Sequence, residues 1–568
     1  MCGINGISWE NSNDISKMNE AIVHRGPDGN GTYVDDGVSL GHVRLSILDP
    51  TTKANQPMVN EINSLVLVYN GELYNFKEIK EKLVKKGIKF LTNSDTEVIL
   101  YAYQEYGTAI FKELNGIFSF AILDKEKQQL ILVRDRLGIK PLYYGFKGND
   151  IIFSSELKGI KCVLELEFSE NRTWDYLLSS NITGESYYSN VTPLTPGTFG
   201  TFDLNSKEFI TEKYCQLTDL IKEKKYNKQG QVAEKKIIDE LDELLNTVVK
   251  DQMVSDVPIA SVGSGGLDSS LVTAIAAQYN SDISVYHVKV DDDKCDESKY
   301  AKQVAKYLNL ELKTEILSKS NYLEYVDYCI EVEELPLSHP NSVGIYLISK
   351  KAKEDGIKVL LTGEGADELF GGYHRYKAYQ KKLMFNRLPI LPKIIKKFSN
   401  LLIHPGFGGF STEDVANYLE QAPGFAFNVE RNRFITELKT AFSFIENEKD
   451  RELKTYISTD LQYYLPPILR RTDRMSMAAG LEMRVPFLDN RLLDFSLNLP
   501  VKHQINKYEL KYLLKKVGER YLPRDIVYRS KKGFPLPIND WLGDDDFKNC
   551  MNNKWLMLNN EPNAKHQR

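Results

Sequence analysis

Cysteine stands at position 2, where removal of the initiator methionine would make it the first residue. Cys2 would then carry a thiol and a free α-amino group on the same residue. Such an amine titrates at about pKa 7.7–8.0, so near neutral pH it can take the thiol proton directly or through a water. The opening of the chain therefore predicts a nucleophile with its own base. The alternative is an incidental cysteine at a frayed terminus.

A second run able to do chemistry is Ser264-Gly265-Gly266-Leu267-Asp268-Ser269-Ser270, between a strand-like and a helix-like stretch. Its glycines let the backbone approach an anion closely, and the N–H groups that open the helix would hold phosphate oxygens. The serine hydroxyls add donors, and Asp268 could face a Mg²⁺ that the phosphates share. The run lacks the lysine of P-loop ATPases and resembles the pyrophosphate-binding loop of ATP-pyrophosphatases. The alternative is a Gly-Ser turn that binds nothing.

Three carboxylates, Glu364, Asp367 and Glu368, stand in the run from Thr362 to Tyr373, which also follows a predicted strand. Beside a triphosphate they would be repulsive unless a cation intervened, and Mg²⁺ between Asp268 and Asp367 would remove the conflict. The alternative is an acidic surface turn.

Cations stand near the C-terminus, in the run Tyr528-Arg529-Ser530-Lys531-Lys532-Gly533-Phe534-Pro535. A lysine placed at the phosphates would stabilise the charge that develops during adenylation. By spacing alone this is a weak indication, because most Lys-Lys pairs are solvated.

The first 200 residues predict short strands in meanders with a few helices, which is typical of layered sheets covered by helices. The expected strands are 65–69, 117–122 and 129–133, and the expected helices are 76–86 and 95–106.

The second half alternates between strands and helices, which predicts a doubly wound parallel sheet with ligands at the carboxyl ends of its strands. The expected strands are 258–262, 284–290, 311–317 and 357–361, with helices from 268, over 297–308 and over 346–353; beyond Gly371 the chain is predicted to be mainly helical.

At 568 residues the chain is too long for one core. We expect a first domain over 2–205, a linker over 206–235, a second domain over 236–545 and a polar tail over 546–568. Residues 543–568 have little core-forming material, so we expect disorder there. The net charge of −5 argues against nucleic acid or an anionic membrane as a partner. We see no secretory signal and no membrane span. The six cysteines form no CxxC motif, so we expect a reduced, cytoplasmic compartment.

The chain resembles glutamine-dependent asparagine synthetases from Cys2 to about Leu542. Many separate motifs agree in order, and they are Cys2-Gly3-Ile4, His24-Arg25-Gly26-Pro27-Asp28, Gly41-His42-Val43-Arg44-Leu45-Ser46-Ile47, Tyr69-Asn70-Gly71-Glu72-Leu73-Tyr74-Asn75, Ser94-Asp95-Thr96-Glu97, Arg134-Asp135-Arg136-Leu137-Gly138-Ile139-Lys140-Pro141-Leu142, the two loops above, Asp473-Arg474-Met475-Ser476-Met477 and Glu482-Met483-Arg484-Val485-Pro486-Phe487-Leu488-Asp489. The resemblance implies an αββα N-terminal-nucleophile sandwich, followed by a doubly wound ATP-pyrophosphatase domain with a helical C-terminal part.

For the first domain the resemblance implies a glutaminase in which Cys2 attacks the side-chain amide of glutamine. Arg44 would bind the glutamine carboxylate, a task that suits its fork of donors. Glu72 and Asp95 would hold the α-amino group, and Asn70 with the Gly71 N–H would form the oxyanion hole.

For the second domain the resemblance implies that the acceptor is aspartate, activated by ATP as an acyl-adenylate and reached by ammonia through an internal tunnel. Asp268 and Asp367 would be Mg²⁺ ligands, Glu364 would assist adenylate formation, and Lys531, rather than Lys532, would be the synthetase lysine. The expected ATP-binding positions are Val262, Ser264, Gly265, Gly266, Asp268, Ser269, Val288, Thr362 and Gly363. The sequence leaves a homodimer open.

Three positions depart from the family pattern. Gly263 replaces an apolar strand residue, Lys289 replaces a small residue, and His339 stands where an acidic residue is usual. These are either neutral variations or marks of a different acceptor carboxylate, such as a uronic acid of a sugar nucleotide. A β-lactam synthetase, which generally lacks the leading cysteine, and a scaffold with eroded sites are the remaining alternatives, and the intact site residues argue against both.

Overall fold

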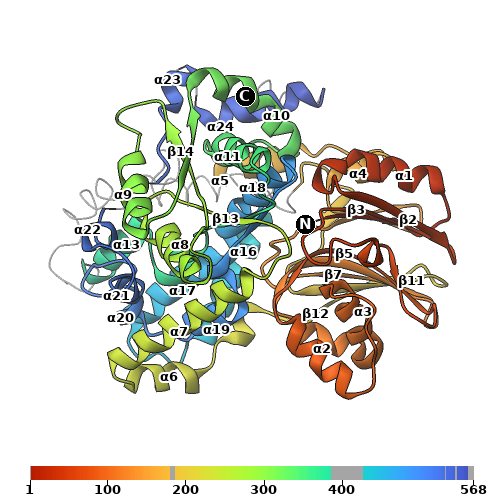
Figure 1. The fold of residues 1–568 in the computed structure, drawn as a ribbon, viewed down its shortest axis with the longest axis horizontal. Helices are drawn as coiled ribbons and strands as arrows, with labels where there is room; N and C mark the ends of the chain where they lie inside the picture. Colours follow the sequence, from red (N-terminus) through yellow and green to blue (C-terminus); the bar gives the residue numbers. More distant parts are fainter. Residues whose placement is uncertain (1, 180–185, 386–425, 531–532, 544–545, 561–568) are drawn as a thin grey trace.

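The computed structural model describes residues 2–179, 186–385, 426–530, 533–543 and 546–560. The chain folds into two parts that lie side by side, with two antiparallel sheets in the first part and a parallel sheet with many helices in the second (Figure 1). Within the described segments, no helix is both long enough and apolar enough to cross a bilayer. All six cysteines lie in described segments, and none forms a disulfide.

The first part contains two six-stranded sheets. The first sheet has the order β10-β8-β9-β1-β3-β2, formed by β1 (Gly3–Ile7), β2 (Gly29–Asp35), β3 (Val38–Arg44), β8 (Tyr143–Lys147), β9 (Asp150–Ser154) and β10 (Val191–Pro193). The second sheet has the order β12-β11-β7-β6-β5-β4, formed by β4 (Met58–Val59), β5 (Leu65–Leu73), β6 (Gly116–Asp124), β7 (Gln129–Arg134), β11 (Thr198–Asp203) and β12 (Phe209–Lys213).

The two sheets pack face to face through alternating apolar residues, including Ile4 and Phe153 from the first sheet and Val68 and Leu132 from the second, all fully buried. Helices cover the outer faces, with α1 (Ser12–Ala21) and α4 (Leu157–Lys161) on the first sheet and α2 (Phe76–Lys85) and α3 (Asp95–Tyr106) on the side of the second (Figure 1). These four layers confirm the predicted αββα sandwich.

The second part is built on a parallel sheet with the strand order β15-β14-β13-β16-β17. Its strands are β13 (Ile259–Val262), β14 (Val285–Val290), β15 (Leu312–Leu317), β16 (Val359–Leu361) and β17 (Glu482–Arg484). The order reverses between β13 and β16, so the loops that leave these two neighbours diverge and open a crevice at their carboxyl ends. The doubly wound parallel sheet predicted from the sequence is therefore confirmed, and its switch point lies between the two predicted nucleotide loops.

Helices flank this sheet on both faces and fill the rest of the second part. They are α6 (Glu223–Gln231), α7 (Glu234–Gln252), α8 (Leu267–Tyr279), α9 (Ser298–Leu308), α10 (Lys319–Glu333), α11 (Ser342–Glu354), α12 (Ala366–Phe370), α13 (His374–Phe385), α16 (Ala426–Ala441), α17 (Glu448–Tyr463), α18 (Leu465–Ala478), α19 (Asn490–Leu497), α20 (Val501–Gln504), α21 (Tyr512–Gly518), α22 (Arg524–Val527), α23 (Ile538–Leu542) and α24 (Phe547–Leu558). The remaining elements are α5 (Glu170–Ser179) of the first part and the 3₁₀ turns η1 (Val23–Arg25), η2 (Thr52–Ala54), η3 (Gly107–Lys112), η5 (Leu217–Leu220) and η6 (Pro486–Leu488).

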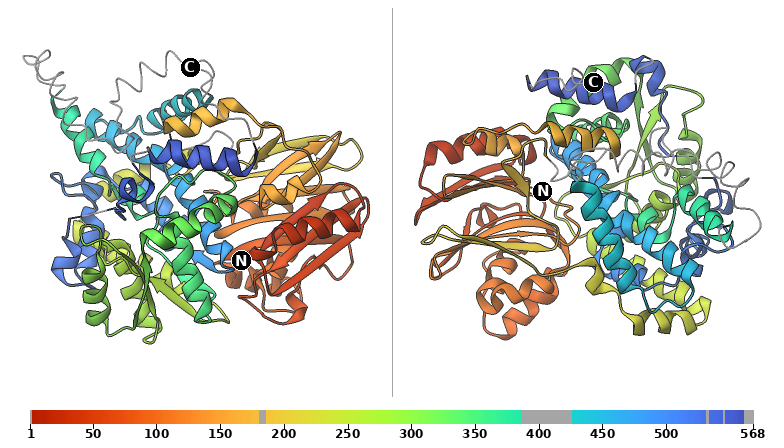
Figure 2. Two further views of the ribbon diagram at one scale, coloured as in Figure 1. Left: turned by 90° about the horizontal axis from the view of Figure 1, so that it is seen from above. Right: turned by 180° about the vertical axis from the view of Figure 1, so that it is seen from behind.

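The expectation of a disordered C-terminal tail is wrong for residues 547–558. These residues form α24, which packs against α5 and α10 (Figure 2). Met551, Trp555 and Leu556 are buried at helical spacing, so the helix has an apolar face that packs on the core. The domain boundaries stay a prediction; β12 and α6 both lie within 206–235, the segment expected to be a linker.

Candidate active sites

Cys2 lies directly before β1, a central strand of the first sheet, and its side chain is buried. Its backbone nitrogen, which becomes the α-amino group once Met1 is removed, donates to Asn70 Oδ1 at 3.0 Å. Its carbonyl oxygen accepts from Arg25 Nε at 3.1 Å. Burial raises the pKa of the Cys2 thiol above its usual value, although the Leu45 N–H and the Arg44 charge lower it. The thiol therefore needs a base at neutral pH, and the nearest candidate is the amine on the same residue.

The predicted glutamine-site residues Arg44, Gly71, Glu72 and Asp95 line one small cavity together with Cys2. Asp95 opens α3, and its carboxylate accepts from the Leu73 N–H at 2.9 Å and the Tyr69 hydroxyl at 2.8 Å. Burial raises its pKa. The structure thus brings residues from β3, β5 and α3 around the thiol.

The Arg44 guanidinium is aimed by the loop that follows β3. It donates to the carbonyl oxygens of Thr51 at 2.8 Å and Asp49 at 2.5 Å, and to Asn55 Oδ1 at 2.7 Å. Because carbonyl groups hold the cation without neutralising it, Arg44 keeps its charge for a carboxylate ligand.

Asn70 and Gly71 are fixed by the pairing of β5 with β6, in which Asn70 lies opposite Ser119. A Cβ atom at Gly71 would lie 2.2 Å from the carbonyl oxygen of Ile117, so only glycine fits there. This close packing fixes the backbone beside Cys2, where an oxyanion hole is expected.

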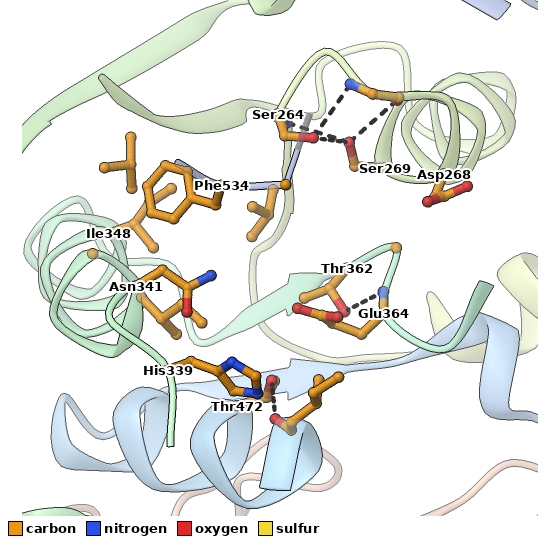
Figure 3. Close-up of a pocket in the computed structure, with 18 of the residues that line it drawn as sticks. Ser264, Asp268, Ser269, His339, Asn341, Ile348, Thr362, Glu364, Thr472 and Phe534 are labelled. Carbon is orange, nitrogen blue, oxygen red and sulfur yellow. Dashed lines mark hydrogen bonds between the residues drawn. The ribbon is translucent and has the colours of Figure 1, made fainter. Parts of the chain in front are cut away.

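The two predicted nucleotide loops meet at the switch point of the parallel sheet and line a cavity of about 430 Å³ (Figure 3). The Ser264 and Ser269 hydroxyl oxygens lie 3.0 Å apart, and Ser264 Oγ accepts from the Gly266 N–H at 3.2 Å. Gly265 has φ of +70°, and a Cβ on it would lie 2.5 Å from the Ala301 nitrogen. These contacts hold the loop against the start of α8, where N–H groups attract an anion.

Of the predicted ATP-binding residues, all but Gly265 line this cavity. They are Val262, Ser264, Gly266, Asp268, Ser269, Val288, Thr362 and Gly363, and Glu364 and Asp367 line it with them. Gly265 shapes the loop through its positive φ and its close approach to Ala301. Lys531 lies outside the described residues, and its role stays a prediction; two residues earlier, Arg529 Nη1 donates to the Gly265 carbonyl oxygen at 2.8 Å.

Lys511 is a functional candidate that the sequence analysis missed. Its Nζ lies 2.5 Å from Asp268 Oδ2 and 2.7 Å from Asp367 Oδ1, and its side chain is buried. The two carboxylates raise the pKa of Lys511 despite its burial. A buried cation therefore lies between the two carboxylates that are expected to bind Mg²⁺. No local pattern marks this lysine, since 243 residues separate it from Asp268.

The carboxylates of Asp268 and Asp367 also fit Mg²⁺, which proteins usually hold through one or two carboxylates together with the phosphates of a substrate. Among the described residues, no group of three or more histidine, cysteine, aspartate or glutamate side chains could hold a metal ion alone.

The wall of the same cavity that contains His339, Asn341 and Arg471 is where we expect the acceptor carboxylate to bind. Arg471, on α18, donates to Glu364 Oε1 at 2.7 Å and to Asn341 Oδ1 at 2.8 Å. Burial, with the charges of Arg471 and Arg470, lowers the pKa of His339 to about 3, so this histidine is neutral. Tyr373, which also lines this cavity, donates its hydroxyl to Glu368 Oε1 at 2.6 Å.

Gly263 and Lys289 are the other two positions that depart from the family pattern, and the structure shows what surrounds each of them. A Cβ on Gly263 would lie 2.4 Å from Val285 Cγ1, so Val285 fills the space that a side chain at 263 would need. Val288 lines the cavity, whereas Lys289 is the next residue on β14, where successive side chains point to opposite faces.

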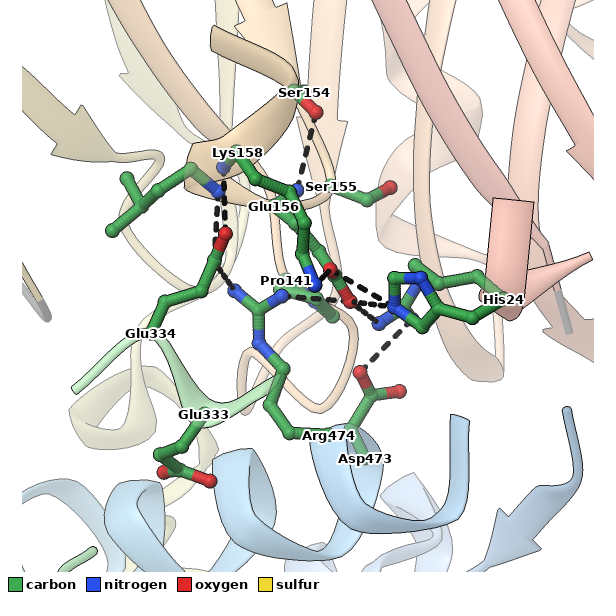
Figure 4. A network of polar contacts seen from close by, with 12 residues as sticks. His24, Pro141, Ser154, Ser155, Glu156, Lys158, Glu333, Glu334, Asp473 and Arg474 are labelled. Atoms are coloured by element: carbon green, nitrogen blue, oxygen red, sulfur yellow. Dashed lines mark hydrogen bonds and ion pairs between the residues drawn. The ribbon is translucent and has the colours of Figure 1, made fainter. Parts of the chain in front are cut away.

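A buried seam of ion pairs joins the two parts of the chain (Figure 4). Glu156 of the first part pairs with Arg25 at 2.7 Å and with Arg474 of α18 at 2.7 Å, and Arg25 pairs with Asp473 at 2.9 Å. Burial would raise the pKa of Glu156, but Arg474, Lys158 and His24 hold it well below its usual range. Arg25 also donates a hydrogen bond to the Cys2 carbonyl oxygen, and α18 also carries Arg471, which lines the nucleotide cavity. The seam therefore lies between the two cavities.

A family model described as asparagine synthase matches residues 240–563, and a model described as glutamine amidotransferase domain matches residues 1–215. The chain belongs to the asparagine synthase family. The resemblance inferred from the motifs is thereby confirmed.

Relatives match over most of this chain. Asparagine synthetase [glutamine-hydrolyzing] 1 of Bacillus subtilis is 31% identical over 98% of this chain and 89% of its own length. A putative asparagine synthetase [glutamine-hydrolyzing] 2 of Methanocaldococcus jannaschii is 35% identical over 70% of this chain and 80% of its own length. A relative named Amidase chry2, of Gibberella zeae, is 27% identical over 95% of this chain and 87% of its own length. The family thus includes proteins whose names differ, which leaves the acceptor to be argued from the site.

Proposed function

We propose that this protein is a glutamine-dependent asparagine synthetase that amidates the side-chain carboxylate of aspartate. The observation that carries the proposal is the presence, in one chain, of a cavity around Cys2 that holds Arg44, Glu72 and Asp95 and of two nucleotide loops at the switch point of a parallel sheet. The proposed substrates are glutamine, ATP and aspartate.

In the first cavity, Arg44 binds the α-carboxylate of glutamine, and Glu72 and Asp95 bind its α-ammonium group. The Cys2 thiol attacks the side-chain amide carbon while its amine takes the thiol proton and passes it to the leaving nitrogen. Ammonia departs, a thioester forms at Cys2, and water hydrolyses it to glutamate. Asn70 and the Gly71 N–H stabilise the oxyanion in both steps.

In the second cavity, an oxygen of the acceptor carboxylate attacks the α-phosphorus of ATP, and pyrophosphate leaves. Ammonia then attacks the acyl carbon of the adenylate, AMP leaves, and the amide nitrogen loses a proton. The loop around Ser264 and the start of α8 bind the pyrophosphate portion. Lys511 stabilises the charge that develops there, and bound Mg²⁺ would neutralise phosphate charge from Asp268 and Asp367.

Ammonia must pass between the cavities without reaching bulk water, where it would be protonated and lost. The buried seam of Arg25, Glu156, Asp473 and Arg474 supports such a transfer, because its side chains are at most 3% exposed and exclude solvent from the boundary.

A second acceptor class, the uronic acid of a sugar nucleotide, is favoured by one observation. His339 is a neutral side chain in the acceptor wall at a position where the family pattern has an acid, so that wall repels a bulkier anion less. An amide-formation assay with aspartate and with uronic acids as competing acceptors decides between the two; turnover of aspartate with a sub-millimolar KM would exclude the sugar acceptor.

The assignment of glutamine hydrolysis to the first cavity and of adenylation to the second is tested with Asp268→Ala. This variant should abolish aspartate-dependent release of pyrophosphate and keep the hydrolysis of glutamine to glutamate. Unchanged pyrophosphate release would contradict the role given to Asp268.

A further inference from the structure

Arg484 belongs to the second part of the chain, but its side chain reaches the glutamine cavity of the first. It ends β17, its side chain is 1% exposed, and its Nη2 lies 3.1 Å from Glu72 Oε1. Strand β17 lies at the edge of the parallel sheet, next to β16. The synthetase part therefore supplies a cation to the wall of the glutaminase cavity.

The guanidinium is held in one orientation by three further groups. Its Nε pairs with Glu482 Oε1 at 2.5 Å, and its Nη1 donates to the carbonyl oxygens of Gln252 at 2.7 Å and Val254 at 2.8 Å, where α7 ends. Its Nη2 makes the ion-pair contact with Glu72. A planar donor fixed on three sides positions its partner, because moving it would leave buried groups unsatisfied.

Arg484 is the charge that most opposes protonation of Glu72. Burial raises the pKa of Glu72 well above its usual range, and nearby Glu482 and Asp95 raise it further, whereas Arg484 is the main charge that lowers it. A cation held beside a buried carboxyl group favours its ionised form, and the ammonium group of a bound amino acid would favour that form further.

The backbone of the same residue contacts the nucleotide cavity. The Arg484 carbonyl oxygen accepts from the Thr362 N–H at 3.0 Å and lies 3.3 Å from the Thr362 hydroxyl. Thr362 lines the nucleotide cavity. One residue therefore lies between an acid of the glutamine cavity and a loop of the nucleotide cavity.

We propose that Arg484 is a positioning residue of the glutamine site, supplied across the boundary between the two parts, which holds the Glu72 carboxyl group in place for the α-ammonium group of the amide donor. This inference rests on the proposed function, in which Glu72 binds that ammonium group. It implies that glutamine binding requires the synthetase part to be docked.

The test measures glutamate formation by the full chain carrying Arg484→Met, Arg484→Lys or, as a matched control, Arg491→Met. The Arg491 side chain is 34% exposed and pairs with Asp251 and Asp489. We expect Arg484→Met to raise the KM for glutamine about 10- to 100-fold with kcat changed less than about threefold, the pattern of lost ground-state binding. Arg484→Lys should restore part of the affinity, and Arg491→Met should match the wild type. An unchanged KM in Arg484→Met, or an equal rise in Arg491→Met, would overturn the inference.

A double-mutant cycle separates positioning from general damage. In a Glu72→Gln background, Arg484→Met should raise the KM less than about threefold, because its effect passes through Glu72; a rise as large as in the wild-type background would overturn the inference. Pyrophosphate release supported by ammonium checks that each variant is folded. If Arg484→Met fails that check, the same cycle with Arg484→Lys decides. A wild type that forms no glutamate from glutamine would instead overturn the proposed function.

Discussion

The side-chain oxygen of Asn70 accepts a hydrogen bond from the backbone nitrogen of Cys2 at 3.0 Å. This contact joins the group expected to act as the base to the residue expected to stabilise the oxyanion. With its oxygen committed to the amine, the Asn70 amide presents its NH₂ group as a donor.

Asn70→Ala should lower kcat for glutamine hydrolysis about 10²- to 10³-fold, because one oxyanion donor is lost. Asn70→Asp is the sharper variant, since it keeps an acceptor for the Cys2 amine and lacks the donor. It should be impaired at least as much. Near-normal glutamate formation by Asn70→Asp would show that Asn70 does not stabilise the oxyanion.

Lys511→Met should lower aspartate-dependent pyrophosphate release at least about 100-fold with either nitrogen source, and leave glutaminase activity intact. It leaves Asp268 and Asp367 without the cation between them, and like charges at close range are unfavourable. We therefore also expect added Mg²⁺ to raise the melting temperature of this variant more than that of the wild type, measured without ATP.

Lys516→Met is the matched control for Lys511, because Lys516 lies on the neighbouring helix α21, is 30% exposed and pairs with Glu519. It should leave pyrophosphate release and the Mg²⁺ response as in the wild type. Equal behaviour of the two variants would refute the role of Lys511.

Glu368 makes the stability of the folded protein depend on pH. Burial, and then the charge of Asp367, raises the pKa of Glu368 to about 7 in the folded protein, from an ordinary value of 4.5. Because the folded state binds this proton more tightly than the unfolded state, the contribution is complete below pH 4.5 and is lost as pH rises through about 7. Glu368→Gln should therefore reduce the decline in melting temperature between about pH 5 and pH 8; an identical decline in both proteins would contradict this.

Trp555 anchors α24, and its side chain is 1% exposed. Trp555→Ala should lower the free energy of unfolding by about 3–5 kcal/mol, measured by urea denaturation, since a large buried ring leaves a cavity. Met557, on the same helix, is 76% exposed. Met557→Ala should change stability by less than about 0.5 kcal/mol, and equal costs at the two positions would show that α24 is not docked.

The nucleotide loops were predictable from the sequence because each is a contiguous run between a strand and a helix. The run around Ser264 carries its glycines, hydroxyls and carboxylate within seven residues, and the strands on either side follow a simple alternation. The glutamine-site residues required the family resemblance, since Cys2, Arg44, Glu72 and Asp95 come from separate elements that only the two-sheet sandwich brings together.

Lys511 and Arg484 were not predictable as site residues because their partners lie far away in the sequence. Lys511 pairs with Asp268 across 243 residues, and Arg484 pairs with Glu72 across the boundary between the two parts. Docking of these parts depends on tertiary packing, which leaves no local periodicity in the sequence.

The central claim is that one chain releases ammonia from glutamine at Cys2 and uses it for amidation at a separate nucleotide site. Its most direct test compares the wild type with Cys2→Ala, with glutamine or ammonium as the nitrogen source, and measures the amide product together with AMP. The account predicts that Cys2→Ala forms no product from glutamine and retains ammonium-dependent amidation near the wild-type rate. Glutamine-dependent product from Cys2→Ala, or loss of both activities in a variant that remains folded, would contradict it.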